Sequence, residues 1–192
     1  MARTLSIKEF SLSGRYTSKV ADELKAALGA APSPTQRIPF TVWCEVLEIW
    51  VLFEALVLVK DGCALAAEVA RRSAARAQNY AARAPRAPKY VEHKYRGWYG
   101  EERTAYYGPW SDHPAFDGYC EGTDAYHAAH HARRAAESTV PTEVAKAVWE
   151  TTRKEAATGM GYLERMWSRV VADVHKDVIE LTAATPRRKK TS

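Results

Sequence analysis

The sequence predicts an all-α protein: a single-domain helical bundle of five or six helices with an aromatic-rich irregular insert that holds a small hairpin. Apolar residues recur at helical spacing in several segments, and most prolines and glycines fall between these segments. The chain has 192 residues, of which 46% are hydrophobic, enough for one core of ordinary size. We therefore expect one helical domain over 1–186, with the insert at approximately 85–122, and a basic disordered tail over 187–192.

The first expected elements are short. Residues 1–16 have no sustained helical pattern, and a short strand is predicted around Leu5 to Phe10. Ser18 can cap a helix that runs to about Leu28, with Gly29 near its end. A linker with two prolines then covers 30–37.

The segment from Ile38 to Val59 is apolar enough to resemble a membrane span, but it contains Glu45, Glu48 and Glu54. The eleven strongly apolar aliphatic or Phe residues between Val42 and Val59 would each favour insertion by about 0.3–0.6 kcal/mol, whereas each carboxylate would oppose it by about 2.5–3.5 kcal/mol. The acids at least cancel the gain, so the segment is interpreted as a core helix. At least one acid should be partly buried, and pairing with an arginine is favoured over general acid–base catalysis.

A long helical region is predicted from Pro39 towards Ala84, either continuous or divided at Asp61-Gly62, because glycine costs about 1 kcal/mol relative to alanine inside a helix. Its second half has a face of small residues that would let another helix approach closely, namely Leu65, Ala66, Val69, Ala70, Ala74 and Ala77. The main core is expected to join this region to the last helix through Trp43, Leu47, Trp50, Phe53, Trp167, Val170 and Val174.

The insert cannot be one regular helix, because prolines and glycines recur throughout it. A small hairpin is predicted from Tyr95 to Tyr107 around Gly100. After it, helices are expected from near Thr123 to about Glu137 and from Ser138 or Thr139 to about Thr158. The last helix has the clearest apolar stripe in the chain: Leu163, Trp167, Val170, Val174, Val178 and Leu181.

The first candidate site is a metal site on the helix after the insert. Asp124, His127 and His131 share one helical face, with His130 close to it, and two imidazoles with a carboxylate are suitable ligands for a divalent metal. Further ligands would come from Glu45 and Glu48, or from His175 or Cys120. The sequence has no HExxH motif. The alternative is a polar helix face, with Glu45 and Glu48 paired to Arg133, Arg134 or another cation.

The second candidate site is a partner-binding surface in the insert, formed by cations next to aromatic rings: Arg83, Arg86, Lys89, Arg96, Trp98, Tyr99 and Trp110. Tyr, Trp and Arg are frequent at the centres of protein interfaces, and cations next to rings also bind single-stranded nucleic acid. Acidic residues predominate over 101–124, and they can neutralise the basic stretch. Another protein or a second copy of the chain is therefore expected before nucleic acid.

Several other sequence patterns give little information about function. Arg169 and His175 have an R-x5-H spacing known from some helical ribonucleases, but six residues on one helix is about 240°, which places them on different faces. The net charge of +5 comes largely from the tail, through Arg187, Arg188, Lys189 and Lys190. Three widely spaced cysteines and the lack of a continuous apolar stretch near the N-terminus lead us to expect a cytoplasmic protein.

The sequence thus favours a non-enzymatic macromolecular binding protein, of an accessory or immunity-like kind, that needs no cofactor and acts through the surface around Arg96 and Trp98. The first alternative is a metal-dependent helical-bundle enzyme that uses the Asp124, His127 and His131 cluster. The second alternative is a nucleic-acid-binding accessory subunit. The composition rich in Ala and Arg is typical of bacterial or phage genes of high GC content.

Overall fold

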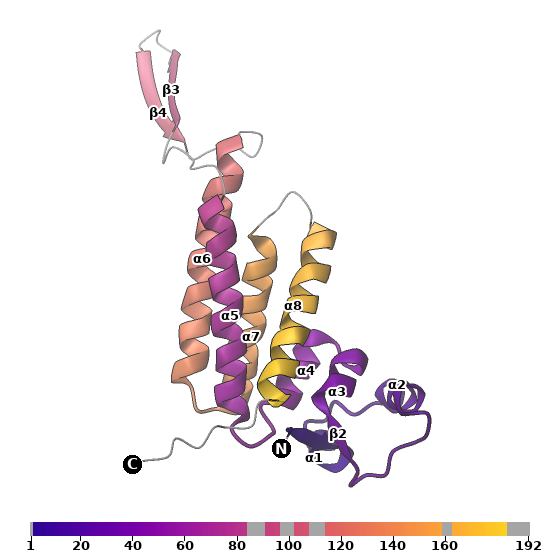
Figure 1. Cartoon of the computed structure of the whole chain (residues 1–192). Helices are drawn as coiled ribbons and strands as arrows, with labels where there is room; N and C mark the ends of the chain where they lie inside the picture. Colours follow the sequence, from indigo (N-terminus) through magenta and orange to yellow (C-terminus); the bar gives the residue numbers. More distant parts are fainter. Residues whose placement is uncertain (1, 84–90, 97–101, 108–113, 159–162, 184–192) are drawn as a thin grey trace.

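A computed structural model describes the backbone of residues 2–83, 91–96, 102–107, 114–158 and 163–183, and the side chains of 2–82, 124–158 and 166–183. The all-α prediction is confirmed. Within the described residues there are eight helices and two small two-stranded sheets. The four long helices α5 to α8 run alongside one another, and the shorter N-terminal elements gather at one end of them (Figure 1). No helix in the described ranges is long and apolar enough to cross a membrane.

The N-terminus forms a strand followed at once by a helix. Strand β1 (Thr4–Ser6) pairs antiparallel with β2 (Arg37–Pro39), and helix α1 covers Ile7–Ser11. The strand predicted from Leu5 to Phe10 is therefore wrong beyond Ser6. The reason is a capping box, in which the Glu9 N–H donates to Ser6 Oγ and the Ser6 N–H donates to the Glu9 carboxylate at 2.9 Å.

Helix α2 (Ser18–Leu28) matches its prediction, although Thr17 rather than Ser18 is the N-cap and Gly29 ends the helix in the left-handed region. The Ile38–Val59 segment, by contrast, is not one helix. It divides into α3 (Phe40–Val46) and α4 (Ile49–Leu56), because Leu47 and Glu48 adopt extended ψ angles of 138° and 144°. This break turns α4 away from the direction of α3.

Helix α5 (Gly62–Arg83) begins at the predicted Asp61-Gly62 division. Asp61 has a φ of +63°, and a Cβ on Gly62 would overlap the backbone carbonyl of Leu56. The corner between α4 and α5 is therefore a close contact of backbone with backbone, which only glycine permits.

The predicted hairpin is confirmed and begins earlier than expected. Strands β3 (Val91–Arg96) and β4 (Glu102–Tyr107) pair antiparallel, with Val91 opposite Tyr107 and Arg96 opposite Glu102. Helix α6 (Pro114–Glu137) starts nine residues before the predicted start at Thr123. Pro114 suits a first helical position, where no N–H is needed, so the last part of the predicted insert is helical.

Helices α7 (Pro141–Ala157) and α8 (Leu163–Ala183) agree with the predicted segments. Helix α5 packs against α6, α7 and α8, and the predicted small-residue face is buried there, with Ala66, Val69, Ala70 and Ala77 fully inaccessible. Alanines of α6 are buried as well, including Ala128 and Ala135. Small side chains on both helices allow the axes to approach closely, which explains the alanine content.

The predicted core is confirmed for five of its seven residues. Trp43, Phe53, Val170 and Val174 are fully inaccessible, and Leu47 is 5% exposed. The other two, Trp50 and Trp167, are only partly buried and lie at the edge of the core. Both take part in the cavities described below.

Candidate functional site

The predicted partner-binding surface falls mainly outside the described residues. Arg86, Lys89, Trp98, Tyr99 and Trp110 are not among them. Arg83 is the last residue of α5 and Arg96 the last of β3, and their side chains are likewise not described. The structure therefore supplies the position of the hairpin and leaves the predicted surface a prediction.

The predicted metal ligands are described, and they have other partners. Asp124 Oδ1 accepts from Lys154 Nζ of α7 at 2.6 Å. The ring of His127 lies edge-on to Tyr126, and burial lowers the pKa of His131.

The proposed further ligands, Glu45 and Glu48, are exposed and lie at the end of α3 and the start of α4. Among the described side chains, no three His, Cys, Asp or Glu residues are grouped closely enough to hold a metal ion. The metal site stays a prediction, which elemental analysis of protein purified without a His tag would test.

A fully buried acid that pairs with arginine is found at residues that the sequence did not single out. Arg76 of α5 donates from Nε to Glu155 Oε1 of α7 at 2.5 Å, and from Nη1 to Asp177 Oδ2 of α8 at 2.6 Å. Arg72 donates to Asp177 Oδ1 at 2.8 Å, and Ser73 Oγ donates to the second oxygen of Glu155. We call Arg72, Arg76, Glu155 and Asp177 the ion-pair cluster; it links three helices.

The ion-pair cluster is a structural device. Glu155 is fully inaccessible, and burial raises its pKa while Arg76 and Ser73 act in the opposite direction. None of the cavities described below is lined by Glu155 or Asp177. The charge-assisted hydrogen bonds of the cluster connect α5, α7 and α8, and we interpret them as contacts that fix these three helices relative to one another.

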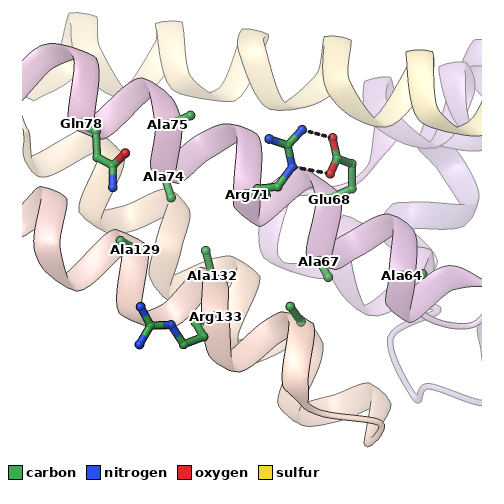
Figure 2. A pocket seen from close by; sticks show the side chains of 11 residues that line it. Ala64, Ala67, Glu68, Arg71, Ala74, Ala75, Gln78, Ala129, Ala132 and Arg133 are labelled. Atoms are coloured by element: carbon green, nitrogen blue, oxygen red, sulfur yellow. Dashed lines mark hydrogen bonds and ion pairs between the residues drawn. The ribbon is translucent and has the colours of Figure 1, made fainter.

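A shallow groove of about 600 Å³ runs between α5 and α6. Figure 2 shows its alanine side chains, with Arg71 and Glu68 of α5 joined by two dashed contacts and Arg133 projecting from α6. Those two contacts are both 2.6 Å long, so the charge of Arg71 is already balanced. The groove has few polar groups to orient a ligand, which distinguishes it from a typical small-molecule site.

The richest site surrounds Trp50, which lines three neighbouring cavities. The first has a volume of about 360 Å³, and we call it the tryptophan hollow; it is lined by Leu47, Glu48, Ile49, Trp50, Trp149, Trp167, Val171 and His175. The second, of about 540 Å³, we call the basic hollow; it is lined by Arg15, Trp50, Glu54, Thr142, Ala145, Lys146 and Trp149. A third of about 240 Å³ lies between Trp50 and α2.

The rings of these hollows are held by specific contacts. Trp149 and Trp167 meet edge to face, with centroids 5.6 Å apart and planes at 88°, so they form a corner. The Arg15 guanidinium lies 4.4 Å from the centroid of Trp50, and Trp50 Nε1 donates to Glu48 Oε2 at 2.9 Å. Arg15 also forms a two-point ion pair with Glu54 at 2.7 and 3.2 Å, which confirms the prediction that one acid of this segment pairs with an arginine.

His175 lines the tryptophan hollow and also has a buried polar atom. Its Nε2 is buried and has no hydrogen-bond partner among the described residues, and burial lowers the pKa of the imidazole, so the ring is neutral at pH 7. A buried nitrogen without a partner favours a bound hydrogen-bonding group, either water or a ligand. The sequence has no local signal for this arrangement, because the lining residues come from three separate segments of the chain.

No family model, no curated protein and no solved structure matches this chain.

Proposed function

We propose that this chain is a non-enzymatic binding protein that recognises another protein through the β3–β4 hairpin and its flanking segments. The observation that carries the proposal is the position of the hairpin, which stands beyond the ends of α5 and α6, clear of the other described elements (Figure 1). In the described part of the chain its sheet has two strands only. A two-stranded hairpin alone is marginally stable in water, so a partner that covers it would supply the missing packing.

The residue types of this region support a protein partner. Arg96, Trp98, Tyr99 and Trp110 belong to the types that dominate interface hot spots. Both edges of a two-stranded sheet can also pair with an extended segment of another chain. The acidic residues over 101–124 disfavour nucleic acid, whose phosphates they would repel.

The test is an Arg96→Ala, Trp98→Ala double variant of the full chain, compared with the wild type and with a control. The control is Tyr126→Ala, Arg153→Ala, which removes the same two kinds of side chain from exposed positions on α6 and α7. Affinity capture from a lysate of the source organism and light scattering after size exclusion measure partner binding and self-association. The wild type and the control should bind the same partner, or self-associate, and the double variant should not.

Three results would contradict the proposal. The double variant could retain the complex, which would place the interface elsewhere. It could lose its helical circular-dichroism signal, which would make Arg96 and Trp98 structural. Nuclease treatment could abolish the capture, which would favour the nucleic-acid-binding alternative.

A further inference from the structure

The tryptophan hollow and the basic hollow share Trp50 and Trp149, so they adjoin each other, and a ligand that spans both would contact these two rings. Their volumes of about 360 and 540 Å³ lie within the range of small-molecule sites, roughly 300–1,000 Å³. They are formed by described side chains of α4, α7 and α8 with Arg15, at residues that the proposed function does not use. A ligand here would bind independently of the hairpin.

The tryptophan hollow has the chemistry of a cation site. Glu48 is the one formally charged residue among those that line it, since His175 is neutral at pH 7. The remaining lining is three indoles and three aliphatic side chains, and indole faces attract cations. Glu48 accepts one hydrogen bond, from Trp50, which leaves most of its lone pairs available to a ligand.

The basic hollow has the opposite charge. Arg15 and Glu54 neutralise each other through their two-point ion pair, so the charge of Lys146 remains. Lys146 is exposed, on the same helix as Trp149 and three residues before it. The joined hollows therefore present a carboxylate among rings at one end and an ammonium group at the other.

We propose that the joined hollows bind a small zwitterion with a methylated ammonium group, with that group among Trp50, Trp149 and Trp167 next to Glu48 and its anionic group beside Lys146. A methylated ammonium group suits this lining because it is cationic, has an apolar surface and offers no N–H that would need a partner. An anion at the other end complements Lys146. Phosphocholine has both groups and is the probe.

The binding test is calorimetric titration of the full chain with phosphocholine, choline and 3,3-dimethylbutanol up to about 10 mM, the weak end of measurable affinity. The last compound has the shape of choline without its charge. Phosphocholine should bind most tightly, choline less, and the uncharged compound at least about fivefold more weakly than choline. Equal binding of choline and its uncharged analogue, or no binding of phosphocholine, would overturn the proposal.

Matched variants locate the two ends of the ligand. Glu48→Gln keeps an acceptor for Trp50 and removes the charge, so affinity for choline and phosphocholine should fall about tenfold. The control Glu45→Gln, three residues earlier and not among the residues that line the two hollows, should leave this affinity unchanged. Lys146→Ala should weaken the binding of phosphocholine but not the binding of choline. The control, Lys176→Ala on α8, should change neither. If Glu48→Gln has no effect on either ligand, the proposed orientation is wrong.

A methylated ammonium group can be free or on a lipid headgroup, and vesicles distinguish the two sources. Sedimentation with phosphatidylcholine vesicles and with phosphatidylglycerol vesicles separates headgroup recognition from general attraction to lipid. If the site binds a free solute, the protein should bind phosphocholine in solution and remain in the supernatant with both kinds of vesicle. Sedimentation with phosphatidylcholine alone, abolished by Glu48→Gln, would assign the same site to the headgroup.

Discussion

The ion-pair cluster and the tryptophan hollow use the same two helices, α7 and α8, and they differ in how completely their polar groups are paired. In the cluster, Arg76, Glu155 and Asp177 satisfy one another at 2.5–2.6 Å. Of the residues that line the hollow, His175 has a buried Nε2 that has no hydrogen-bond partner among the described residues. A satisfied polar network stabilises a fold, whereas an unpaired polar atom beside a cavity marks a place for another molecule.

Helix geometry keeps the two regions apart. Asp177 and His175 are two residues apart on α8, which is about 200° around the helix, and Trp149 and Glu155 are six apart on α7, about 240°. Each helix thus turns one face to the ion-pair cluster and another to the hollow. Substitution of an exposed residue of the hollow, such as Glu48, should therefore change binding with little loss of stability.

The largest effect is expected when the cluster loses one member. Glu155→Ala leaves Arg76 without its closest partner in a buried site, so the free energy of unfolding should fall by about 3–5 kcal/mol. Chemical denaturation measures this change in the free energy of unfolding. Glu150→Ala, which removes a partly exposed acid one turn earlier on α7, is the control and should cost about 1 kcal/mol or less. Equal losses for both variants would contradict a stabilising role for the ion-pair cluster.

Two tryptophans seven residues apart give the next comparison. Trp43 is fully inaccessible and its indole N–H donates to the Leu5 carbonyl at 3.3 Å, so Trp43→Ala should lower the free energy of unfolding by about 3–5 kcal/mol. Trp50 borders three cavities, so Trp50→Ala should cost less than Trp43→Ala in the same denaturation experiment. A larger loss for Trp50 would assign it to the core.

The pH dependence of stability tests the environment of His175. Burial lowers its pKa in the folded protein, so the unfolded chain takes up the proton first, and stability is lost as the pH falls below about 6.5 towards the folded pKa. Between about pH 7.5 and about pH 5.5, His175→Leu should lose less stability than the wild type. Burial also lowers the pKa of His131, so over the same pH range a His131→Leu, His175→Leu double variant should lose less stability than His175→Leu alone. An unchanged pH dependence in His175→Leu would contradict its burial as a neutral ring.

The smallest effect is expected for Arg15, whose side chain is 45% exposed. Its ion pair with Glu54 lies at the surface, so Arg15→Ala should change the free energy of unfolding less than any of the variants above. The same variant removes the cation from the face of Trp50 and should shift tryptophan emission. A large loss of stability with unchanged emission would contradict this arrangement.

The parts of the fold that the sequence predicted depend on local patterns. The apolar stripe of α8, the small-residue face of α5 and the hairpin of β3 and β4 can each be recognised within a short window, and each is confirmed. The early start of α6 at Pro114 was missed because Gly118 and Gly122 resemble loop residues. Tertiary packing can override such weak propensities.

The sites required information that a single window does not contain. Arg76 meets Glu155 across 79 residues and Asp177 across 101, and no local spacing relates them. Trp43 and Trp50 were both assigned to the core because seven residues on one helix differ by only about 20°. The extended residues Leu47 and Glu48 break that relation, and they place Trp50 at the cavities instead.

The contact of Gly62 with the Leu56 carbonyl has a consequence for recognising relatives of this chain. A side chain at this position would push α5 away from α4, and the distance between the two helices would have to grow. Chains that keep this corner should therefore keep glycine here while the surrounding alanines exchange with other small residues. A glycine that follows a short apolar helix and begins a long alanine-rich one is thus a more durable signature of this architecture than any of its charged residues.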